Sequence, residues 1–463
     1  MKHVHFIGIC GVGMGALAIM MKNKGWKVTG SDVGFYPPVS LHLKKFGIEY
    51  YSGWHVEKIG TPDLVVVGNV AGSENPEWKY VQDNKISYVS YPELIARELV
   101  RKNSIVCAGT YGKTSTTALL TWILKNANYK PAYMFGGLSE TPELSSDDLG
   151  GQWSILEGDE YKTSRWDNNP KFSHYSPTHL LLTAIKWDHA DVYPTEQNYF
   201  EAFEKLVKMI PKDGLIVTNK KILDNKILNI KKIISNIQYP ISVVTYGQTD
   251  GCDYNYSEII QTKEGLSFNI IHQNKTYQVK TNLIGEYQAE NICGAFAMAN
   301  AIVIPTEKII SAISNFQGIK RRLEKRGQTI GGADIFDDIA HSPAKAKSVL
   351  DALKKTYQTK IIAIFEPNTG NRENAAMPGY DHAFDGADLI IIPRLTKIKT
   401  TPGQKHVEGP ELMKIISKTH NNVKYFEDDN ELINFIKQNA AKGDAVVFLG
   451  SHGFRGMIES IIN

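Results

Sequence analysis

The chain has 463 residues, of which 42% are hydrophobic and 22% are charged, and its formal net charge is +3. This length exceeds what one hydrophobic core supports, so about two to four domains are expected in a soluble globular protein. The net charge is too small to suggest nucleic acid or an anionic membrane surface as the main partner, and no apolar run in the sequence is long enough to cross a bilayer.

The first hundred residues alternate short apolar runs with helical patterns. Strands are predicted at residues 3–9, 26–30 and 64–68, and helices at 14–24, 40–46 and 92–101. This alternation predicts a parallel sheet covered by helices, in a first domain of residues 1–102. The first strand begins at once, without the basic and apolar regions of a signal peptide, and the four cysteines lie far apart in sequence. Both features favour a cytoplasmic protein without a zinc or disulfide framework.

A glycine-rich turn follows the first predicted strand. Gly11, Gly13 and Ala16 satisfy the pattern G-x-G-x-x-A, and Asp32 ends the next predicted strand about 20 residues later. Glycines in such a turn let a pyrophosphate approach the backbone amides, so we expect a diphosphate-bearing ligand here. The pattern does not say which nucleotide binds, and glycines needed only for a tight turn are the alternative.

A second strand–loop–helix unit begins at residue 103. An apolar run (104–108) is followed by the loop 109–114, with the sequence Gly-Thr-Tyr-Gly-Lys-Thr, and by a predicted helix at 115–126. Lys113 can reach terminal phosphates and the Thr114 hydroxyl can bind Mg²⁺, as in P-loops. Cys107 stands where the full P-loop pattern has its first glycine. The alternative is an ordinary turn with a solvated lysine.

Acidic residues follow two later strands of this unit. Glu157, Asp159 and Glu160 end the strand at 153–156, and His189 lies between Asp188 and Asp191 after the strand at 180–184. Ligands of open α/β sheets bind at the carboxyl ends of strands, and Mg²⁺ prefers carboxylate oxygens and substrate phosphates. A magnesium site is therefore expected. A solvated acidic loop and a structural histidine are the alternatives.

The rest of the chain also alternates predicted strands and helices. Further strands are predicted at 215–218 and 242–245 and a helix at 196–209, followed by antiparallel hairpins between 253 and 283 and helices at 287–301 and 306–316. Buried strands at 360–365, 389–392 and 445–449 predict a third parallel sheet. We therefore expect three α/β domains: 1–102, 103–318 with a small antiparallel sheet, and 319–463.

The start of the third domain carries charged clusters. Consecutive arginines at 321 and 322 could clamp phosphate oxygens, or form a solvated basic face. The paired aspartates Asp337 and Asp338 could bind a ribose, or cap the next helix.

Taken in order, these motifs resemble the ATP-dependent Mur ligases of bacterial cell-wall synthesis. The matching stretches are the glycine-rich start, 109–114, 157–160, 188–189, 285–291, 320–322 and 337–338. The resemblance implies an N-terminal Rossmann-like UDP-binding domain, a central P-loop-type ATPase domain, and a C-terminal Rossmann-like domain that closes over ATP and binds the amine. It also implies that ATP, with Mg²⁺, phosphorylates a muramyl carboxylate, and that an amine then attacks the acyl phosphate.

The resemblance assigns candidate residues by position. Catalytic candidates are Lys113, Glu157, His189 and Arg322, and the candidate Mg²⁺ ligands are Thr114, Glu157 and His189. Candidates for ATP are Gly109, Thr110, Gly112, Lys113, Thr114, Ser115, Asn291, Arg322, Asp338 and His341. Candidates for the UDP substrate are Gly11, Val12, Gly13, Met14, Gly15, Ser31, Asp32 and Asn69, and those for the amine are Asn368, Thr369, Asn371 and Arg372.

Local stretches favour one branch of the family. Several stretches resemble the recycling ligases that join UDP-N-acetylmuramate to the tripeptide L-alanyl-γ-D-glutamyl-meso-diaminopimelate. They are residues 30–32, 36–38, 68–69, 160–161, 171–172, 174–175, 188–191, 320–324 and 365–367. The alternative is the branch of ligases that add L-alanine to UDP-N-acetylmuramate. For the oligomeric state, we expect a monomer or a weak homodimer.

The chain also departs from the family pattern. Tyr111, Tyr287, Gln288 and Ser342 stand where histidine or asparagine is usual. A UDP-sugar-binding protein without turnover is therefore a second alternative. An NAD-dependent dehydrogenase, built on the glycine-rich turn, is a third.

Overall fold

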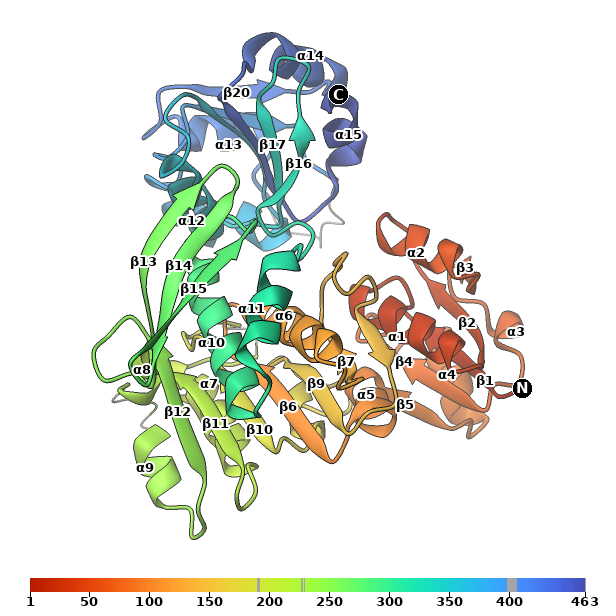
Figure 1. The fold of residues 1–463 in the computed structure, drawn as a ribbon. Coiled ribbons are helices and arrows are strands. Elements are labelled where there is room, and N and C mark those ends of the chain that lie inside the picture. The colour runs from red at the N-terminus through yellow and green to blue at the C-terminus, as the bar shows by residue number, and fades with distance from the viewer. Residues whose placement is uncertain (190–191, 226–227, 229, 398–405, 463) are drawn as a thin grey trace. The chain divides into compact units, whose positions relative to one another are not determined.

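The computed structural model describes residues 1–189, 192–225, 228, 230–397 and 406–462. Its elements form three sheets with helices packed on them, which confirms the predicted α/β fold (Figure 1). None of the helices within these residues is long and apolar enough to cross a membrane.

The first sheet is parallel and has the order β3-β2-β1-β4-β5. The inner strand β4, between β1 and β5, is buried at all four residues, as expected for a parallel sheet covered on both faces. The strands are β1 (His3–Ile7), β2 (Lys27–Asp32), β3 (Glu49–Ser52), β4 (Leu64–Val67) and β5 (Tyr88–Ser90), and the helices are α1 (Val12–Asn23), α2 (Val39–Lys45), α3 (Val56–Ile59), α4 (Pro76–Asp83) and α5 (Tyr91–Leu99).

The second sheet has ten strands in the order β15-β14-β13-β12-β11-β10-β6-β9-β7-β8. Its strands are β6 (Asn103–Ala108), β7 (Ala132–Met134), β8 (Ser146–Asp148), β9 (Trp153–Gly158), β10 (His179–Leu182), β11 (Leu215–Asn219), β12 (Ser242–Gly247), β13 (Tyr254–Thr262), β14 (Gly265–His272) and β15 (Lys275–Thr281). Its helices are α6 (Lys113–Asn126), η1 (Lys171–His174), α7 (Glu196–Lys208), α8 (Lys220–Leu223), α9 (Ile230–Ser235), α10 (Tyr287–Ala301) and α11 (Thr306–Asn315).

Two-residue turns connect β13 to β14 and β14 to β15, so the predicted hairpins are present. In the second turn, Gln273 and Asn274 have φ of 49° and 63°, as a type I′ hairpin turn requires.

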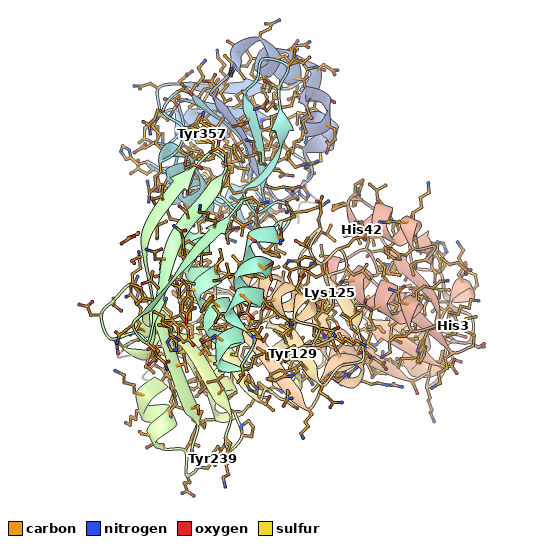
Figure 2. All side chains as sticks on the ribbon, viewed as in Figure 1. His3, His42, Lys125, Tyr129, Tyr239 and Tyr357 are labelled. Atoms are coloured by element: carbon orange, nitrogen blue, oxygen red, sulfur yellow. The ribbon has the colours of Figure 1, made fainter. Side chains whose placement is uncertain are left out.

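The third sheet has the order β16-β17-β21-β18-β19-β20 and is parallel except for β16. Tyr357, labelled in Figure 2, is fully buried in the core of this sheet and donates a hydrogen bond to Asp334 Oδ2 at 2.6 Å. The strands are β16 (Glu324–Gln328), β17 (Asp334–Asp338), β18 (Ile361–Glu366), β19 (Leu389–Pro393), β20 (Val423–Phe426) and β21 (Ala445–Gly450). The helices are α12 (Pro343–Lys354), η2 (Thr369–Arg372), η3 (Asn374–Tyr380), α13 (Gly409–Ile416), α14 (Asp429–Asn439), η4 (Phe454–Gly456) and α15 (Met457–Ile461).

The residue contacts divide the chain into two compact units. The first unit comprises residues 1–259, 267–281 and 289–318, and the second comprises 260–266, 282–288 and 319–463. The glycine-rich turn, the 109–114 loop and the acids after β9 all belong to the first unit.

Candidate functional site

The 109–114 loop lies between β6 and α6, at the carboxyl ends of parallel strands. Strand β6 pairs with β9 on one side and β10 on the other, which places the loop next to residues 157–160. Gly109 and Gly112 have φ of 142° and 82°, values that side-chain-bearing residues rarely adopt. A Cβ atom at Gly112 would lie 2.3 Å from Asn291 Oδ1, so glycine lets the loop pack against α10.

The first turn of α6 begins directly at Lys113, so the N–H groups of Lys113, Thr114 and Ser115 have no acceptor within the helix. These donors and the helix dipole favour an anion at this position. The loop is therefore suited to hold phosphate oxygens.

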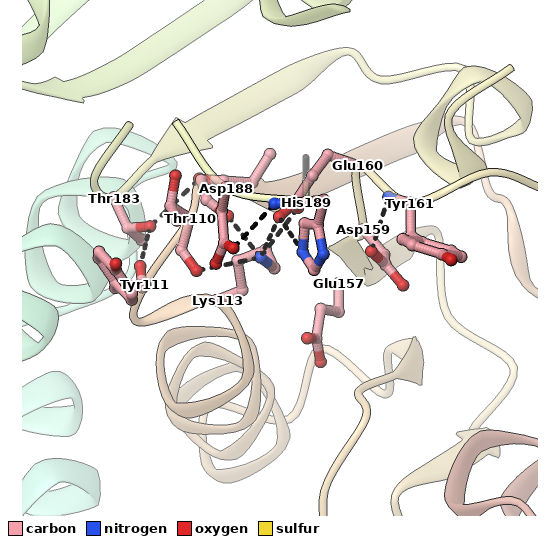
Figure 3. Close-up of polar contacts among 12 residues, drawn as sticks. Thr110, Tyr111, Lys113, Glu157, Asp159, Glu160, Tyr161, Thr183, Asp188 and His189 are labelled. Carbon is pink, nitrogen blue, oxygen red and sulfur yellow. Dashed lines mark hydrogen bonds and ion pairs between the residues drawn. The ribbon is translucent and has the colours of Figure 1, made fainter. Parts of the chain in front are cut away.

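The side chain of Lys113 contacts its own loop and the buried carboxylate of Glu160 (Figure 3). Its Nζ atom donates to Gly109 O at 2.6 Å and lies 2.9 Å from Glu160 Oε2 and 3.1 Å from Oε1. Burial opposes the charge of Lys113, but Glu160, Asp159 and Glu157 outweigh this effect and raise the pKa of the ammonium group. Lys113 therefore carries a full positive charge at the mouth of the loop.

Thr114 and Glu157 supply hard oxygen atoms beside this lysine. Thr114 Oγ1 donates to Glu157 Oε1 at 2.8 Å, and Gly136 N donates to Glu157 Oε2 at 2.6 Å. Burial raises the pKa of the Glu157 carboxyl. These two residues suit Mg²⁺, which commonly takes one or two protein oxygens and completes its shell with substrate phosphates and water.

His189, the third predicted metal ligand, instead contacts Glu160. Its Nε2 atom lies 3.3 Å from Glu160 Oε1, and a hydrogen bond from this ring to Glu160 raises the pKa of His189. His189 has a φ of 56°, a left-handed conformation uncommon outside glycine. Within the described residues, no three His, Cys, Asp or Glu side chains are grouped so that they could hold a metal ion. Ala190 and Asp191, part of the same motif, lie outside the described residues.

The glycine-rich turn is held by Asp32. Cys10 N donates to Asp32 Oδ2 and Val33 N to Asp32 Oδ1, both at 2.8 Å. Ser31 is turned away from the turn, since its hydroxyl donates to the buried carboxylate of Glu77 at 2.5 Å.

The remaining UDP candidates of this turn lie at the start of α1. Gly11 precedes the helix and Val12 begins it, and both are exposed. Met14 and Gly15 are buried in the first core, so only their backbone atoms could face a ligand. Gly13 packs against an aromatic ring, because a Cβ atom there would lie 2.7 Å from Tyr91 Oη.

In the second unit, the two consecutive arginines separate into different environments. Arg321 is bound to its own domain through Asp337 Oδ1 at 3.2 Å and the carbonyl oxygens of Ser451 and His452 at 3.0 and 2.8 Å, whereas Arg322 is exposed. The pair therefore does not form a joint phosphate clamp, and only Arg322 presents its guanidinium group to solvent.

Asp338 and His341 follow β17. Asp338 accepts hydrogen bonds from Leu323 N at 2.6 Å and Ala340 N at 2.8 Å, and its burial raises its pKa. The alternative, that these aspartates cap the next helix, does not hold, because Ser342 caps α12 by accepting from Lys345 N. His341 Nδ1 contacts Ile339 O at 2.7 Å, which assigns the proton to Nδ1 and leaves Nε2 as an acceptor when the ring is neutral.

The amine candidates lie at η2, after β18. Asn368 caps this helix by accepting from Asn371 N at 3.2 Å, and Thr369 begins it. Arg372 is 2% exposed and donates to Val407 O at 3.0 Å and Thr396 O at 2.9 Å. Arg372 thus supports the loop that carries the other three.

Sequence reasoning missed several groups that shape the site. Tyr199 on α7 donates to Glu160 Oε1 at 3.3 Å and also contacts Thr110 Oγ1 at 2.8 Å, and Tyr193 donates to Glu160 O at 2.5 Å. Glu160 was recognisable in the sequence as one of three acids at the end of β9, whereas neither tyrosine belongs to a sequence motif that would have indicated its contact.

Comparisons with known proteins cover nearly the whole chain. Residues 3–102 match the catalytic domain of the Mur ligase family, residues 107–299 the Mur ligase middle domain, and residues 321–452 the Mur ligase glutamate ligase domain. The UDP-N-acetylmuramate–L-alanyl-γ-D-glutamyl-meso-2,6-diaminoheptandioate ligase of Haemophilus influenzae is 32% identical over 374 residues, 80% of each chain.

Two further relatives extend over the full length. The UDP-N-acetylmuramate–L-alanine ligase of Desulfitobacterium hafniense is 28% identical over 465 residues, 99% of each chain. The crystal structure of a murein peptide ligase from Psychrobacter arcticus has a TM-score of 0.71 and 26% identity, covering 100% of this chain and 98% of that one. The chain therefore belongs to the Mur ligase family, whose members are ATP-dependent, ADP-forming ligases of peptidoglycan synthesis.

Proposed function

We propose that this protein joins UDP-N-acetylmuramate to the tripeptide L-alanyl-γ-D-glutamyl-meso-diaminopimelate, in the recycling of peptidoglycan in the cytoplasm. The choice of amine is supported by the 32% identity to the H. influenzae tripeptide ligase and by the local stretches that resemble this branch. We further propose three domains, 1–102, 103–318 and 319–463, for the UDP-sugar, ATP and the amine, respectively.

The observation that carries the proposed chemistry is that Lys113 and Thr114, at the start of α6, lie beside Glu157 on strand β9, which accepts a hydrogen bond from the Thr114 hydroxyl. Lys113 and the first N–H groups of α6 would hold the β- and γ-phosphates of ATP, and Thr114 and Glu157 would hold Mg²⁺. The bound metal would offset negative charge on the phosphates during transfer. His189 would join this set only after exchanging its contact with Glu160.

The proposed reaction has two steps. An oxygen of the muramyl carboxylate attacks the γ-phosphorus, which releases ADP and leaves an acyl phosphate. The neutral amine of the peptide then attacks the acyl carbon, the C–O bond to phosphate breaks, and the amine nitrogen loses a proton. Lys113 would offset the negative charge that develops in the first step, and Arg322, Asp338 and His341 are our candidates for further nucleotide contacts.

L-alanine is the second candidate amine, because the full-length match to the D. hafniense enzyme is an alanine ligase. A protein without turnover remains the alternative raised by Tyr111, Tyr287, Gln288 and Ser342. Ser342 has a structural role as the cap of α12, which accounts for its hydroxyl without reference to catalysis. Family membership excludes the dehydrogenase.

The proposal is tested by measuring phosphate release with UDP-N-acetylmuramate, ATP and Mg²⁺, with either the tripeptide or L-alanine as the amine. We expect a higher kcat/KM with the tripeptide. A higher value with L-alanine would replace the proposed amine, and absence of release with both would favour the protein without turnover.

A further inference from the structure

The chain between Glu160 and η1 folds into a compact loop of residues 161–171. Thr163 N donates to Asn169 O at 2.8 Å, and Lys171 N donates to Tyr161 O at 3.0 Å, so the loop is closed across its width. It begins one residue after Glu160, which contacts Lys113. The loop is therefore anchored to the candidate ATP site.

The base of this loop lies beside the glycine-rich turn. Lys171 Nζ lies 2.5 Å from Asp159 Oδ2 and 5.9 Å from the centre of the Tyr91 ring. The same ring packs on Gly13, where a Cβ atom would lie 2.7 Å from Tyr91 Oη. One tyrosine thus separates the acids after β9 from the turn that is our candidate for the diphosphate.

The tip of the loop is fixed by aromatic contacts with the first sheet and its helices. The Trp166 ring lies 5.1 Å from Trp78 on α4 and 5.4 Å from Tyr88 on β5, measured between ring centres. The neighbouring Arg165 donates from Nε to the carbonyl oxygen of Asn69 at 3.2 Å.

Asn69 in turn sits against the glycine-rich turn. A Cβ atom at Gly68 would lie 3.3 Å from Met14 Cε, and one at Gly8 would lie 2.4 Å from Val70 Cγ1. The residues on both sides of Asn69 therefore pack on the turn, and the Asn69 carbonyl holds Arg165 close to it.

Arg165 is an exposed cation with spare donors. A guanidinium group has five N–H donors, and Nε uses one of them on Asn69. Among the ion pairs within the described residues, none involves Arg165. Arginine binds phosphate and carboxylate groups through paired N–H donors, so an anion near the turn would complete its coordination.

We propose that Arg165 binds an anionic oxygen of the UDP-sugar substrate, with Trp166 holding the loop tip in place. The inference rests on the proposed function for the identity of that substrate. Two groups of UDP-N-acetylmuramate offer the required chemistry, the diphosphate and the lactyl carboxylate. In either case Arg165 would connect substrate binding in the first domain to the acids that follow β9.

The test is calorimetric binding of UDP-N-acetylmuramate and of UDP-N-acetylglucosamine, which has the diphosphate but lacks the carboxylate. Arg165→Ala in the full-length protein should weaken binding roughly 10- to 100-fold, as expected for loss of a charged hydrogen bond. If the variant binds both compounds more weakly, the diphosphate is the group that Arg165 contacts. If it binds only UDP-N-acetylmuramate more weakly, Arg165 contacts the lactyl carboxylate. Binding of both within twofold of the wild type would overturn the inference.

Two further variants separate charge from folding. Arg97→Ala removes a cation that pairs with Glu98 on α5, and should leave both affinities unchanged. Arg165→Lys keeps the charge without the paired donors and should fall between the wild type and Arg165→Ala. If the wild type itself bound neither compound, the proposed function would fail, and Arg165 would have no assigned ligand.

Discussion

Replacing Glu160 with glutamine tests the electrostatics of the candidate ATP site. Glu160 is fully buried and lies 2.9 Å from the ammonium group of Lys113 and 3.3 Å from His189 Nε2. Removing one partner of a buried ion pair typically costs about 3–5 kcal/mol. Glutamine still offers an amide oxygen to Lys113, and the charges of Asp159 and Glu157 remain nearby, so we expect a loss of about 2 kcal/mol.

Differential scanning calorimetry of the nucleotide-free protein measures this effect. A loss of about 2 kcal/mol corresponds to a fall of about 4–8 °C in the Tm of a domain of 150–250 residues. Glu204→Gln on α7 is the matched control, because Glu204 lies 3.8 Å from Lys208 in a surface pair of the same domain. The reasoning is refuted if the Glu160 and Glu204 variants unfold within 1 °C of each other, roughly the shift of a surface pair.

Three other predictions follow from the same structure. Lys113→Ala should abolish phosphate release and leave the Kd for UDP-N-acetylmuramate unchanged in calorimetry; a large rise in that Kd would contradict separate sites. Asp32→Ala removes the acceptor of Cys10 N and Val33 N, so UDP-N-acetylmuramate binding should weaken by roughly tenfold, and unchanged affinity would show that the turn keeps its shape alone. Burial lowers the pKa of His179 from 6.5 to about 4. Between these pH values the unfolded chain binds a proton that the folded protein does not, so the free energy of unfolding falls as the pH drops from 6.5 to 4, by at most about 3 kcal/mol. Urea titrations at pH 7 and pH 4.5 should show a smaller pH effect for His179→Gln, and an equal effect would refute this cause.

The fold could be predicted where apolar runs are long and continuous. Strands such as β4 and β21 are buried at every residue, so the sequence shows them directly. Strand β3 was missed because its four residues are exposed or only partly buried and give no apolar run. The α6 helix begins at Lys113 instead of the predicted residue 115, since the positive φ of Gly112 turns the chain into the helix at once.

The candidate site was only partly readable from the sequence. Adjacent residues with fixed chemistry, such as Lys113 and Thr114, are recognised by spacing alone. The contact of Glu160 with Tyr199 joins residues 39 positions apart, and no local pattern encodes it. For Arg372 the sequence suggested a ligand contact, because it is an arginine in a polar loop. In the structure its side chain instead donates hydrogen bonds to the carbonyl groups of Val407 and Thr396.

The carboxylate beneath Lys113 has a consequence for how the nucleotide enters. Under the proposed function, incoming phosphate oxygens would compete with Glu160 for the Lys113 ammonium group, and a displaced Glu160 would leave its negative charge close to a polyanion. A divalent cation bound with the phosphates would cancel that repulsion, whereas ATP without a metal would not. Uptake of nucleotide and of metal should therefore be thermodynamically linked, each raising the affinity for the other.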